Sequence, residues 1–494
     1  MDKIIFYTNS KIAHLYFWKC IEQVHDAFEN CSIMIYIDKD ARSLPKEFFL
    51  NSFIKKIDSK FSNLKANPFE LVDLNLKAEK LKNICITDKL DDLEKSEWII
   101  LENKPFKNKF NDFAKNGFLL LDLNYNLLKH NTLNEKLMML SIVKLDQISK
   151  NCKEVFKVNL KCEIGINNNI NKILLNYSIF LVKFLKNSNS FSKKRVYKTS
   201  SFKLTFKSRI FNKFKFLFYY FNLMLKIFLR KLKKQQLNWK IGIKKNGVIK
   251  FLEQPKNSFW ADPFIVIGEN GNSFVYFEEL KNDSLGKISC VEINSKFEIV
   301  DKQDIINTNY HLSFPNVFLI DGNYYMIPES SQNSTLQLYK CTKLPFQWEF
   351  KLNLMENIKL LDATWIHHDG LYWIFANKIE DFEYDNNEKL YLYYSDDLFS
   401  NKWKSHIKNP IVTDASLARN AGNFILNNGK LIRPSQNCFN GYGKNVVMNE
   451  VKVLNTEDYI EEKIKELFPV KGAVGAHTIN SHEDLCVMDF LVKE

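Results

Sequence analysis

The stretch NSFWADPFIVIGENGNSFVYFEEL, residues 257–280, has the pattern of a β-hairpin with an acidic residue near its start. Its Asn-Gly dipeptide supplies the positive φ angles of a type I′ turn between two apolar runs. Three later stretches repeat this strand–turn–strand pattern, each with Asp-Gly or Asn-Gly at the turn: residues 314–330, 362–378 and 420–436. Further strand candidates follow each hairpin, and a period of about fifty residues is typical of propeller blades. With residues 475–492 as a weaker fifth copy, the sequence predicts a five-bladed β-propeller.

Polar side chains recur at matching positions of these hairpins. The seventh residue after each turn glycine is, in order, Glu278, Glu329, Asn377 and Gln436. Asp262 and Asp362 stand at the start of the first strand in the first and third copies. A hairpin brings the start of its first strand beside the end of its second, so we expect all six side chains on one face, near the propeller axis.

We also expect Asp262 to be extended, because a proline at the next position disfavours helical geometry in the residue before it. Converging carboxyl groups suit glycosyl chemistry, in which one group stays ionised while the pKa of a neighbour rises enough to donate a proton. Substrate binding, to sugar hydroxyls or a phosphate, is predicted for Glu278, for the neutral amides Asn377 and Gln436, and for four bases: His311, Arg419, Arg433 and His477. The structural alternative is that these polar residues close the blades through hydrogen bonds.

The first third of the chain has a different pattern, in which short apolar strands alternate with helical segments. Strands are predicted at residues 3–8, 31–37, 96–103 and 116–124, with a helix at 12–28. This order favours a parallel, Rossmann-type α/β domain. No phosphate-binding glycine motif is present, so no nucleotide cofactor is predicted.

Residues 187–236 form a basic and aromatic connector between the α/β region, 1–186, and the β region, 237–494. Within the connector, residues 213–236 are too short for a transmembrane span. They fit either an amphipathic helix on a membrane surface or a helix packed between two domains.

The bulk composition excludes several classes of protein. The formal net charge of the 494 residues is +13, but no basic patch interleaved with aromatics marks a nucleic-acid groove, and we expect no nucleic-acid partner. Nine scattered cysteines, with no Cys/His cluster at ligand spacing, predict neither a disulfide framework nor a metal site. The start MDKIIFYTNS lacks the features of a signal peptide. We expect a cytoplasmic protein, with the inner face of the membrane as an alternative location.

Many short motifs in residues 239–494 resemble, in order and spacing, those of a known family of propeller domains. They include FWADPF, YFEE, HLSFPNVF, MIPES, LLDAT, ARNAG, IRPSQNC and YG. The family is that of the N-terminal domain of glucosamine inositolphosphorylceramide transferases. Its wider superfamily is similar to the five-bladed glycoside hydrolases of the arabinanase, invertase and levansucrase type.

The resemblance implies a role for each of three acids. Asp262 corresponds to the base or nucleophile, Asp362 to a second, modulating aspartate, and Glu329 to the proton donor. The hydrolase glutamate follows the second aspartate in the chain, whereas Glu329 precedes Asp362. This departure puts ordinary hydrolysis in question.

The α/β region resembles the formyltransferase-like domain that precedes this propeller in bacterial relatives. Formyl transfer needs a histidine close to the transferred carbon, and Leu121 or Asp122 stands where it is expected. The resemblance therefore implies a degenerate formyltransferase-like domain that does not use folate.

Two functional hypotheses follow for the whole chain. In the first, the protein is an enzyme of cell-surface glycan synthesis that transfers or trims a sugar at the propeller centre, from a nucleotide-sugar or lipid-linked substrate. In the second, it is a non-catalytic glycan-binding module or scaffold.

Overall fold

The structure of the protein is a computed structural model that describes most of the chain. The described ranges are 1–38, 70–102, 108–120, 137–145, 152–163, 166–187, 218, 221–222, 224–225, 237–268, 271–281, 284–380, 386–482 and 484–493. The chain divides between Lys231 and Leu232 into two compact units. Most of the connector and the residues Leu121 and Asp122 lie outside the described ranges, so the predictions for them stay predictions.

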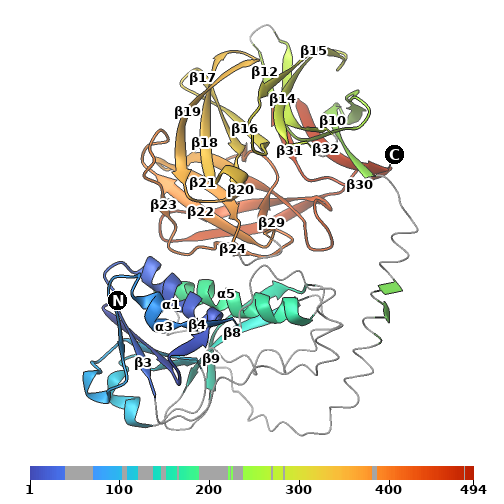
Figure 1. Ribbon diagram of the computed structural model, residues 1–494. Coiled ribbons are helices and arrows are strands. Elements are labelled where there is room, and N and C mark those ends of the chain that lie inside the picture. Colours follow the sequence, from blue (N-terminus) through green and yellow to red (C-terminus); the bar gives the residue numbers. More distant parts are fainter. Residues whose placement is uncertain are drawn as a thin grey trace. The chain divides into compact units, whose positions relative to one another are not determined.

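The N-terminal unit is built on one seven-stranded sheet with the order β5-β3-β1-β6-β7-β8-β9. Its strands are β1 (Lys3–Thr8), β3 (Ser32–Ile37), β5 (Ile84–Thr87), β6 (Trp98–Leu101), β7 (Phe118–Leu120), β8 (Leu137–Leu145) and β9 (Cys152–Lys161). Figure 1 labels its strands β3, β8 and β9. The strands from β5 to β7 are parallel, in the spatial order of a doubly wound domain. The α/β class is confirmed. The antiparallel hairpin of β8 and β9, which the sequence analysis did not predict, extends this parallel sheet at one edge.

Helices α1 (Leu15–Ala27) and α5 (Ile166–Lys186) pack against each other and share the apolar core of this unit. The helix expected at 12–28 begins at Leu15 because β2 (Ile12–His14) pairs with β4 (Leu71–Asp73). The unit also contains α3 (Leu74–Ala78), η1 (Leu90–Asp92) and η2 (Asn108–Phe113). Within the described ranges, no helix combines the length and the apolar character needed to cross a membrane.

The second unit consists of antiparallel sheets, five of them in the described residues. The first contains β12 (Ser258–Ile267), β13 (Ser273–Lys281), β14 (Lys287–Ile293) and β15 (Ile299–Ile306). The second contains β16 (Ser313–Ile320), β17 (Asn323–Glu329), β18 (Thr335–Lys343) and β19 (Gln347–Glu356), with η4 (Ser331–Asn333) between β17 and β18. The third contains β20 (Leu360–His368), β21 (Leu371–Lys378), β22 (Lys389–Ser395), β23 (Lys404–Ser405) and β24 (Val412–Thr413). The fourth contains β25 (Arg419–Asn420), β26 (Ile425–Asn427), β27 (Lys430–Gln436), β28 (Val446–Leu454) and β29 (Tyr459–Leu467).

The fifth sheet joins the two ends of this unit. It contains β10 (Leu237–Lys245), β11 (Val248–Phe251), β30 (Ala473–Gly475), β31 (Ile479–His482) and β32 (Leu485–Lys493). β10 pairs with β32 from Leu237↔Lys493 to Lys244↔Cys486. The weak fifth repeat at 475–492 was therefore only part of a sheet, because its partner strands precede the first repeat.

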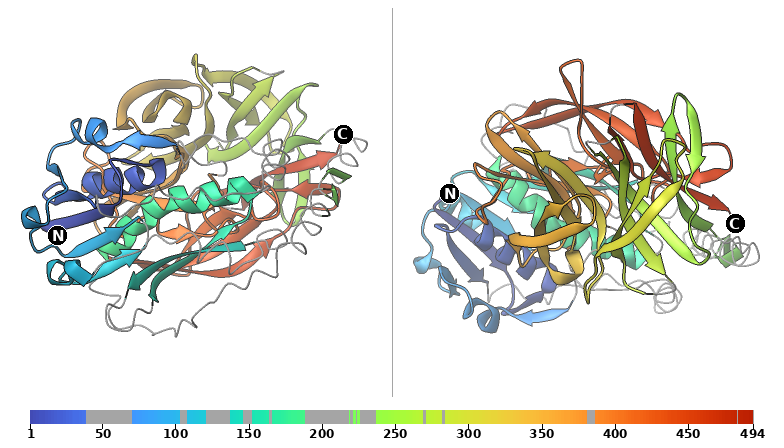
Figure 2. Two further views of the ribbon diagram at one scale, coloured as in Figure 1. Left: turned by 60° about the horizontal axis from the view of Figure 1, so that its bottom comes forward. Right: turned by 90° about the horizontal axis from the view of Figure 1, so that it is seen from above.

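Consecutive sheets pack side by side and close a ring. β12 lies beside β16, β16 and β17 beside β20, and β20 and β21 beside β25. The fourth sheet meets the fifth where the Ile479 N–H donates to the Ala421 carbonyl at 2.8 Å. β31 and β32 then return to β12. This is the arrangement of a β-propeller, and Figure 2 shows the sheets from two further sides.

The hairpin turns have the predicted geometry. In 321–322, 369–370 and 428–429, both residues have φ between 48° and 75°, as a type I′ turn requires. Asn246 and Gly247, at 49° and 83°, make a further turn of this kind between β10 and β11.

Candidate active site

The first strands of three sheets carry a β-bulge at one matching position. The pairing register breaks between Ala261 and Phe264 in β12, and likewise in β16 and β20. The bulge places Asp262 at φ 53° and Asp362 at φ 47°. The expected extended geometry of Asp262 was therefore wrong. The left-handed backbone, which aspartate tolerates better than most residues, is held by the Asp262 N–H donating to Asp489 Oδ2 at 2.9 Å.

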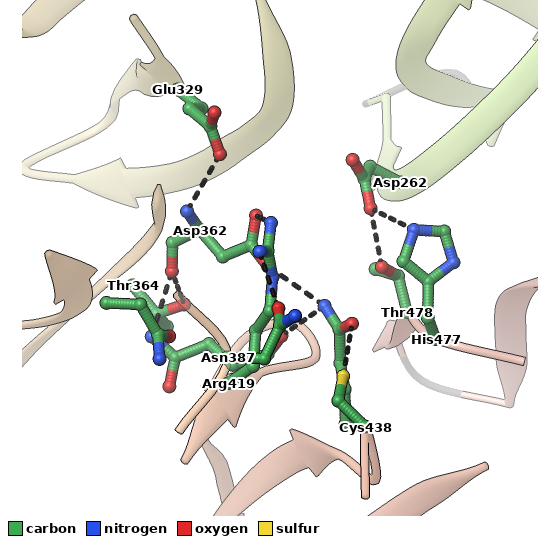
Figure 3. Close-up of polar contacts among 12 residues, drawn as sticks. Asp262, Glu329, Asp362, Thr364, Asn387, Arg419, Cys438, His477 and Thr478 are labelled. Atoms are coloured by element: carbon green, nitrogen blue, oxygen red, sulfur yellow. Dashed lines mark hydrogen bonds and ion pairs between the residues drawn. The ribbon is translucent and has the colours of Figure 1, made fainter. Parts of the chain in front are cut away.

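Two of these bulged residues belong to a group of six ionisable side chains that we call the hub: Asp262, Glu278, Glu329, Asp362, Arg419 and His477. Figure 3 shows five of the six from one side. All four acids are buried, between 2% and 7% exposed. Burial raises the pKa of Glu278 and of Asp362, and the charge of Asp262 adds to both shifts. Acids from separate repeats thus lie together in the structure, as the sequence predicted.

Asp362 is held by a bidentate ion pair. Arg419 Nε donates to its Oδ2 at 2.6 Å and Nη2 to its Oδ1 at 3.2 Å. Gln436 Nε2 donates to the same Oδ2 at 2.9 Å. Burial raises the pKa of Asp362, and Arg419 opposes that effect. Arg419 and Gln436, which were predicted to bind substrate, therefore both lie in the site, but they donate hydrogen bonds to the Asp362 carboxylate.

His477 lies between two aspartates. Its Nε2 is 3.1 Å from Asp262 Oδ1, and its Nδ1 is 2.9 Å from Asp489 Oδ2. Burial alone lowers the pKa of His477, but Asp489 and Asp262 outweigh burial and raise it to about 10. The imidazole is therefore protonated at neutral pH.

Asp262 is the acid that stays ionised. Burial works against its charge, but His477 and the Thr478 hydroxyl, which donates to Asp262 Oδ1 at 2.7 Å, lower the pKa of Asp262. Asp262, His477 and Asp489 each place one ligand atom within 4.8 Å of the others, a spacing that suits a cation. Asp489, however, already accepts the N–H groups of Asp262, His477 and Thr478. The arrangement fits a protonated imidazole better than a metal ion.

Glu329 has the opposite character. Burial, and then the charge of Asp362, raise its pKa to about 8. Its Oε2 accepts the Asp362 N–H at 3.1 Å, and its Oε1 accepts the Ser331 hydroxyl at 3.0 Å. A carboxyl group with a pKa of about 8 keeps its proton at pH 7, which is the property needed in a proton donor.

Glu278 and His311 form a second acid–base pair. His311 Nε2 lies 3.1 Å from Glu278 Oε1, and His311 Nδ1 accepts the Gly286 N–H at 3.0 Å. The bond at Nδ1 requires the other nitrogen to carry the proton, which it donates to Glu278. This hydrogen bond raises the pKa of His311, and burial raises that of Glu278.

Gly286 has no room for a side chain. A Cβ there would lie 2.5 Å from His311 Cε1 and 2.8 Å from the Leu312 carbonyl oxygen. We therefore expect Gly286→Ala to push His311 away from Glu278 and to lower its pKa toward the ordinary value of about 6.5. An NMR pH titration of the histidine rings measures this shift, and Leu285→Ala is the control. An unchanged His311 pKa in Gly286→Ala would contradict the assignment.

In the described structure, Asn377 makes no hydrogen bond to a hub acid. Its Nδ2 donates to the Lys389 carbonyl at 2.8 Å. Its Oδ1 is buried and has no hydrogen-bond partner in the described structure. The predicted binding residue thus offers one unused acceptor.

Arg433 lies next to the hub but is not part of it. Its placement does not support its predicted role in binding substrate. Its guanidinium is fully buried and donates to both carboxylate oxygens of Glu461, at 2.8 and 2.7 Å. It also donates to Asn420 Oδ1 at 3.0 Å and to the Leu417 carbonyl at 2.7 Å. These bonds hold the fourth sheet together.

Two residues of the site escaped the sequence analysis. Asp489 is the one acid inside the apolar run LCVMDFLV, a pattern that signals a buried, paired charge. Tyr442 is 46% exposed, with its ring 5.2 Å from Arg419 Cζ and 5.3 Å from the His477 ring. It lies in the YG motif, which did not by itself indicate a position.

The fold and site define a β-propeller with a carboxyl-rich centre. Residues 249–482 match the family model described as "Glucosamine inositolphosphorylceramide transferase 1, N-terminal". The protein of that name from Arabidopsis thaliana is 31% identical over 215 residues, which are 42% of this chain and 27% of the relative. The one from Oryza sativa subsp. japonica is 32% identical over 212 residues, 42% of this chain and 28% of the relative. The resemblance of the β region to this family is confirmed, and the match spans little more than a quarter of these relatives.

Solved structures similar to this chain include glycoside hydrolases. A family 117 glycoside hydrolase from Zobellia galactanivorans has a TM-score of 0.36 at 10% identity, covering 53% of this chain and 92% of that one. The α-L-arabinanase of Cellvibrio cellulosa has a TM-score of 0.31 at 12% identity, covering 40% and 76%. Similarity at this level supports no statement about function.

Proposed function

We propose that the protein acts on carbohydrate in cell-surface glycan synthesis, transferring or processing a sugar at the hub of a five-bladed propeller. The observation that carries this proposal is that the buried acids differ in protonation. Asp262 stays ionised as base or charge stabiliser, Glu329 keeps a proton to donate, and Asp362 modulates the pKa of Glu329. The relatives are named glucosamine inositolphosphorylceramide transferases, which agrees with a glycan or lipid-linked sugar as substrate.

The second candidate is a non-catalytic glycan-binding module or scaffold. It is favoured by the saturation of the hub, since Asp362 already accepts bonds from Arg419 and Gln436. For the N-terminal unit we propose a degenerate formyltransferase-like fold without formyl transfer. We further propose a cytoplasmic location, with residues 213–236 touching the membrane; flotation of liposomes with and without this segment tests the contact.

Asp262→Asn separates the two candidates. Asparagine keeps the size of the side chain and tolerates the left-handed backbone, but it removes the charge. A glycan array identifies a ligand for the wild-type protein, and mass spectrometry then follows that ligand alone and with nucleotide sugars. For an enzyme, we expect turnover to fall in Asp262→Asn while binding persists.

Asp369→Asn is the matched control, because Asp369 is a turn residue with a largely exposed side chain. Turnover that survives in Asp262→Asn while glycan binding is lost would contradict the enzymatic proposal. Binding without any change in mass, in all three proteins, would support the scaffold. No glycan binding at all would contradict both.

A further inference from the structure

The basic side chains at the hub are already committed to carboxylates. Arg419 uses Nε and Nη2 on Asp362 and Nη1 on Asn387 Oδ1, the last at 2.8 Å. The Arg419 side chain is only 12% exposed, and its Cζ lies 5.2 Å from the centre of the Tyr442 ring. A phosphate group that needed this guanidinium would have to compete with a bidentate carboxylate, which has the same fork geometry.

The two histidines are committed in the same way. His477 has one ring nitrogen facing Asp262 and the other facing Asp489, and its side chain is 3% exposed. His311 spends Nε2 on Glu278 and uses Nδ1 as an acceptor. His477 Nδ1 makes no hydrogen bond in the described structure but is buried 2.9 Å from Asp489 Oδ2, and the His311 N–H is used on Glu278. Neither ring therefore presents an exposed N–H to an incoming anion.

The charges of the described hub and its neighbour Asp489 leave an excess of negative charge. Three aspartates, at 262, 362 and 489, face two basic side chains, Arg419 and His477, so the carboxyl groups outnumber the basic groups. Glu278 and His311 share a proton, so any positive charge on His311 is balanced by the Glu278 carboxylate. The pair therefore adds no net positive charge. Like charges at short range and low dielectric repel strongly, so a phosphate or diphosphate is disfavoured here.

The remaining features of the site favour a ligand rich in hydrogen-bond donors. Asn377 Oδ1 is a buried acceptor with no partner, at the strand position that Glu278, Glu329 and Gln436 occupy in the other sheets. Tyr442, 46% exposed against Arg419 and His477, offers an aromatic face of the kind on which apolar faces of ligands stack. Hydroxyl or ammonium groups satisfy such a site, whereas phosphate oxygens add only acceptors.

We infer that the hub receives a phosphate-free sugar residue, uncharged or carrying an amine, and not the diphosphate of a nucleotide-sugar or the phosphate of a lipid-linked donor. This inference rests on the proposed function and narrows it. A phosphate-bearing donor must place its phosphates outside the hub, so the hub holds the transferred sugar or the acceptor glycan.

The test uses inorganic pyrophosphate as the probe and the full-length protein in buffer with EDTA at constant ionic strength. Asp362→Asn removes the partner of Arg419 and should create an anion site. We expect no saturable binding by calorimetry in the wild-type protein, and saturable binding in Asp362→Asn. Adding Arg419→Ala to that variant should abolish the gain, which separates the hub from the lysine-rich surface.

Saturable pyrophosphate binding by the wild-type protein that Arg419→Ala abolishes would overturn the inference. A folded Asp362→Asn variant without any gain would also overturn it, because the commitment of Arg419 would then not be the cause. If thermal unfolding shows that Asp362→Asn does not fold, Asp262→Asn, which leaves His477 with one carboxylate, replaces it with the same expected gain. These results do not depend on turnover, so a failure of the proposed glycan activity remains distinguishable.

Discussion

An Arg433→Met variant should lose about 3–5 kcal/mol of its free energy of unfolding, the cost of breaking a buried ion pair from one side. Methionine fills much of the same volume but leaves the Glu461 carboxylate, 6% exposed, without its bidentate partner. Asn420 Oδ1 and the Leu417 carbonyl lose a donor at the same time. Urea unfolding followed by tryptophan fluorescence measures the loss.

Lys430→Met is the matched control on the same strand, because Lys430 is 61% exposed and lies 3.4 Å from Glu450 Oε2. We expect little change there, since exposed ion pairs contribute little to stability. If Arg433→Met were as stable as Lys430→Met but failed to bind glycan, the original assignment of Arg433 to the ligand would be right after all.

The position of Arg433 was within reach of the sequence. Side chains alternate between the two faces of a strand, and Arg433 and Gln436 are three positions apart in β27. They must therefore point to opposite faces. Since Gln436 faces Asp362, Arg433 faces away from the hub, and the register rule applied to the predicted hairpin would have shown it.

The hairpins themselves were predictable because their signals are local. Asn-Gly and Asp-Gly fix the turns, and the turn fixes the register of the two strands. Positions counted from the turn glycine therefore placed Glu329 and Gln436 beside Asp362 correctly. In the N-terminal unit, short apolar runs, which are also a local signal, predicted β1 and β3.

Non-local contacts could not be predicted in this way. The pairing of β10 with β32 joins segments more than two hundred residues apart, and no turn links them. Asp489 lies in that sheet and was therefore missed, although it holds the backbone of Asp262 and the ring of His477. The bulge that turns Asp262 to positive φ depends on this partner, so Pro263 alone gave the wrong conformation.

Glu329→Gln should lower sugar turnover by roughly 10²- to 10⁴-fold, the usual contribution of a positioned general acid. Glutamine keeps the shape and can still accept the Asp362 N–H, which lies 3.1 Å from Glu329 Oε2, but it has no proton to transfer. Glu349→Gln, at an exposed position of β19, is the control and should leave turnover unchanged.

The pH dependence makes this assignment specific. Because the pKa of Glu329 is about 8, wild-type turnover should hold at neutral pH and fall as the pH rises through 8, where the donor loses its proton. Asp362 contributes to that raised pKa through its charge, so Asp362→Asn should move the alkaline limb to lower pH. Infrared spectroscopy gives a second readout: a protonated carboxyl band at pH 7 that is absent from Glu329→Gln and disappears in the wild type above pH 8. A band that survives in Glu329→Gln would assign the proton to another acid, and an alkaline limb that stays in place in Asp362→Asn would separate Asp362 from the proton donor.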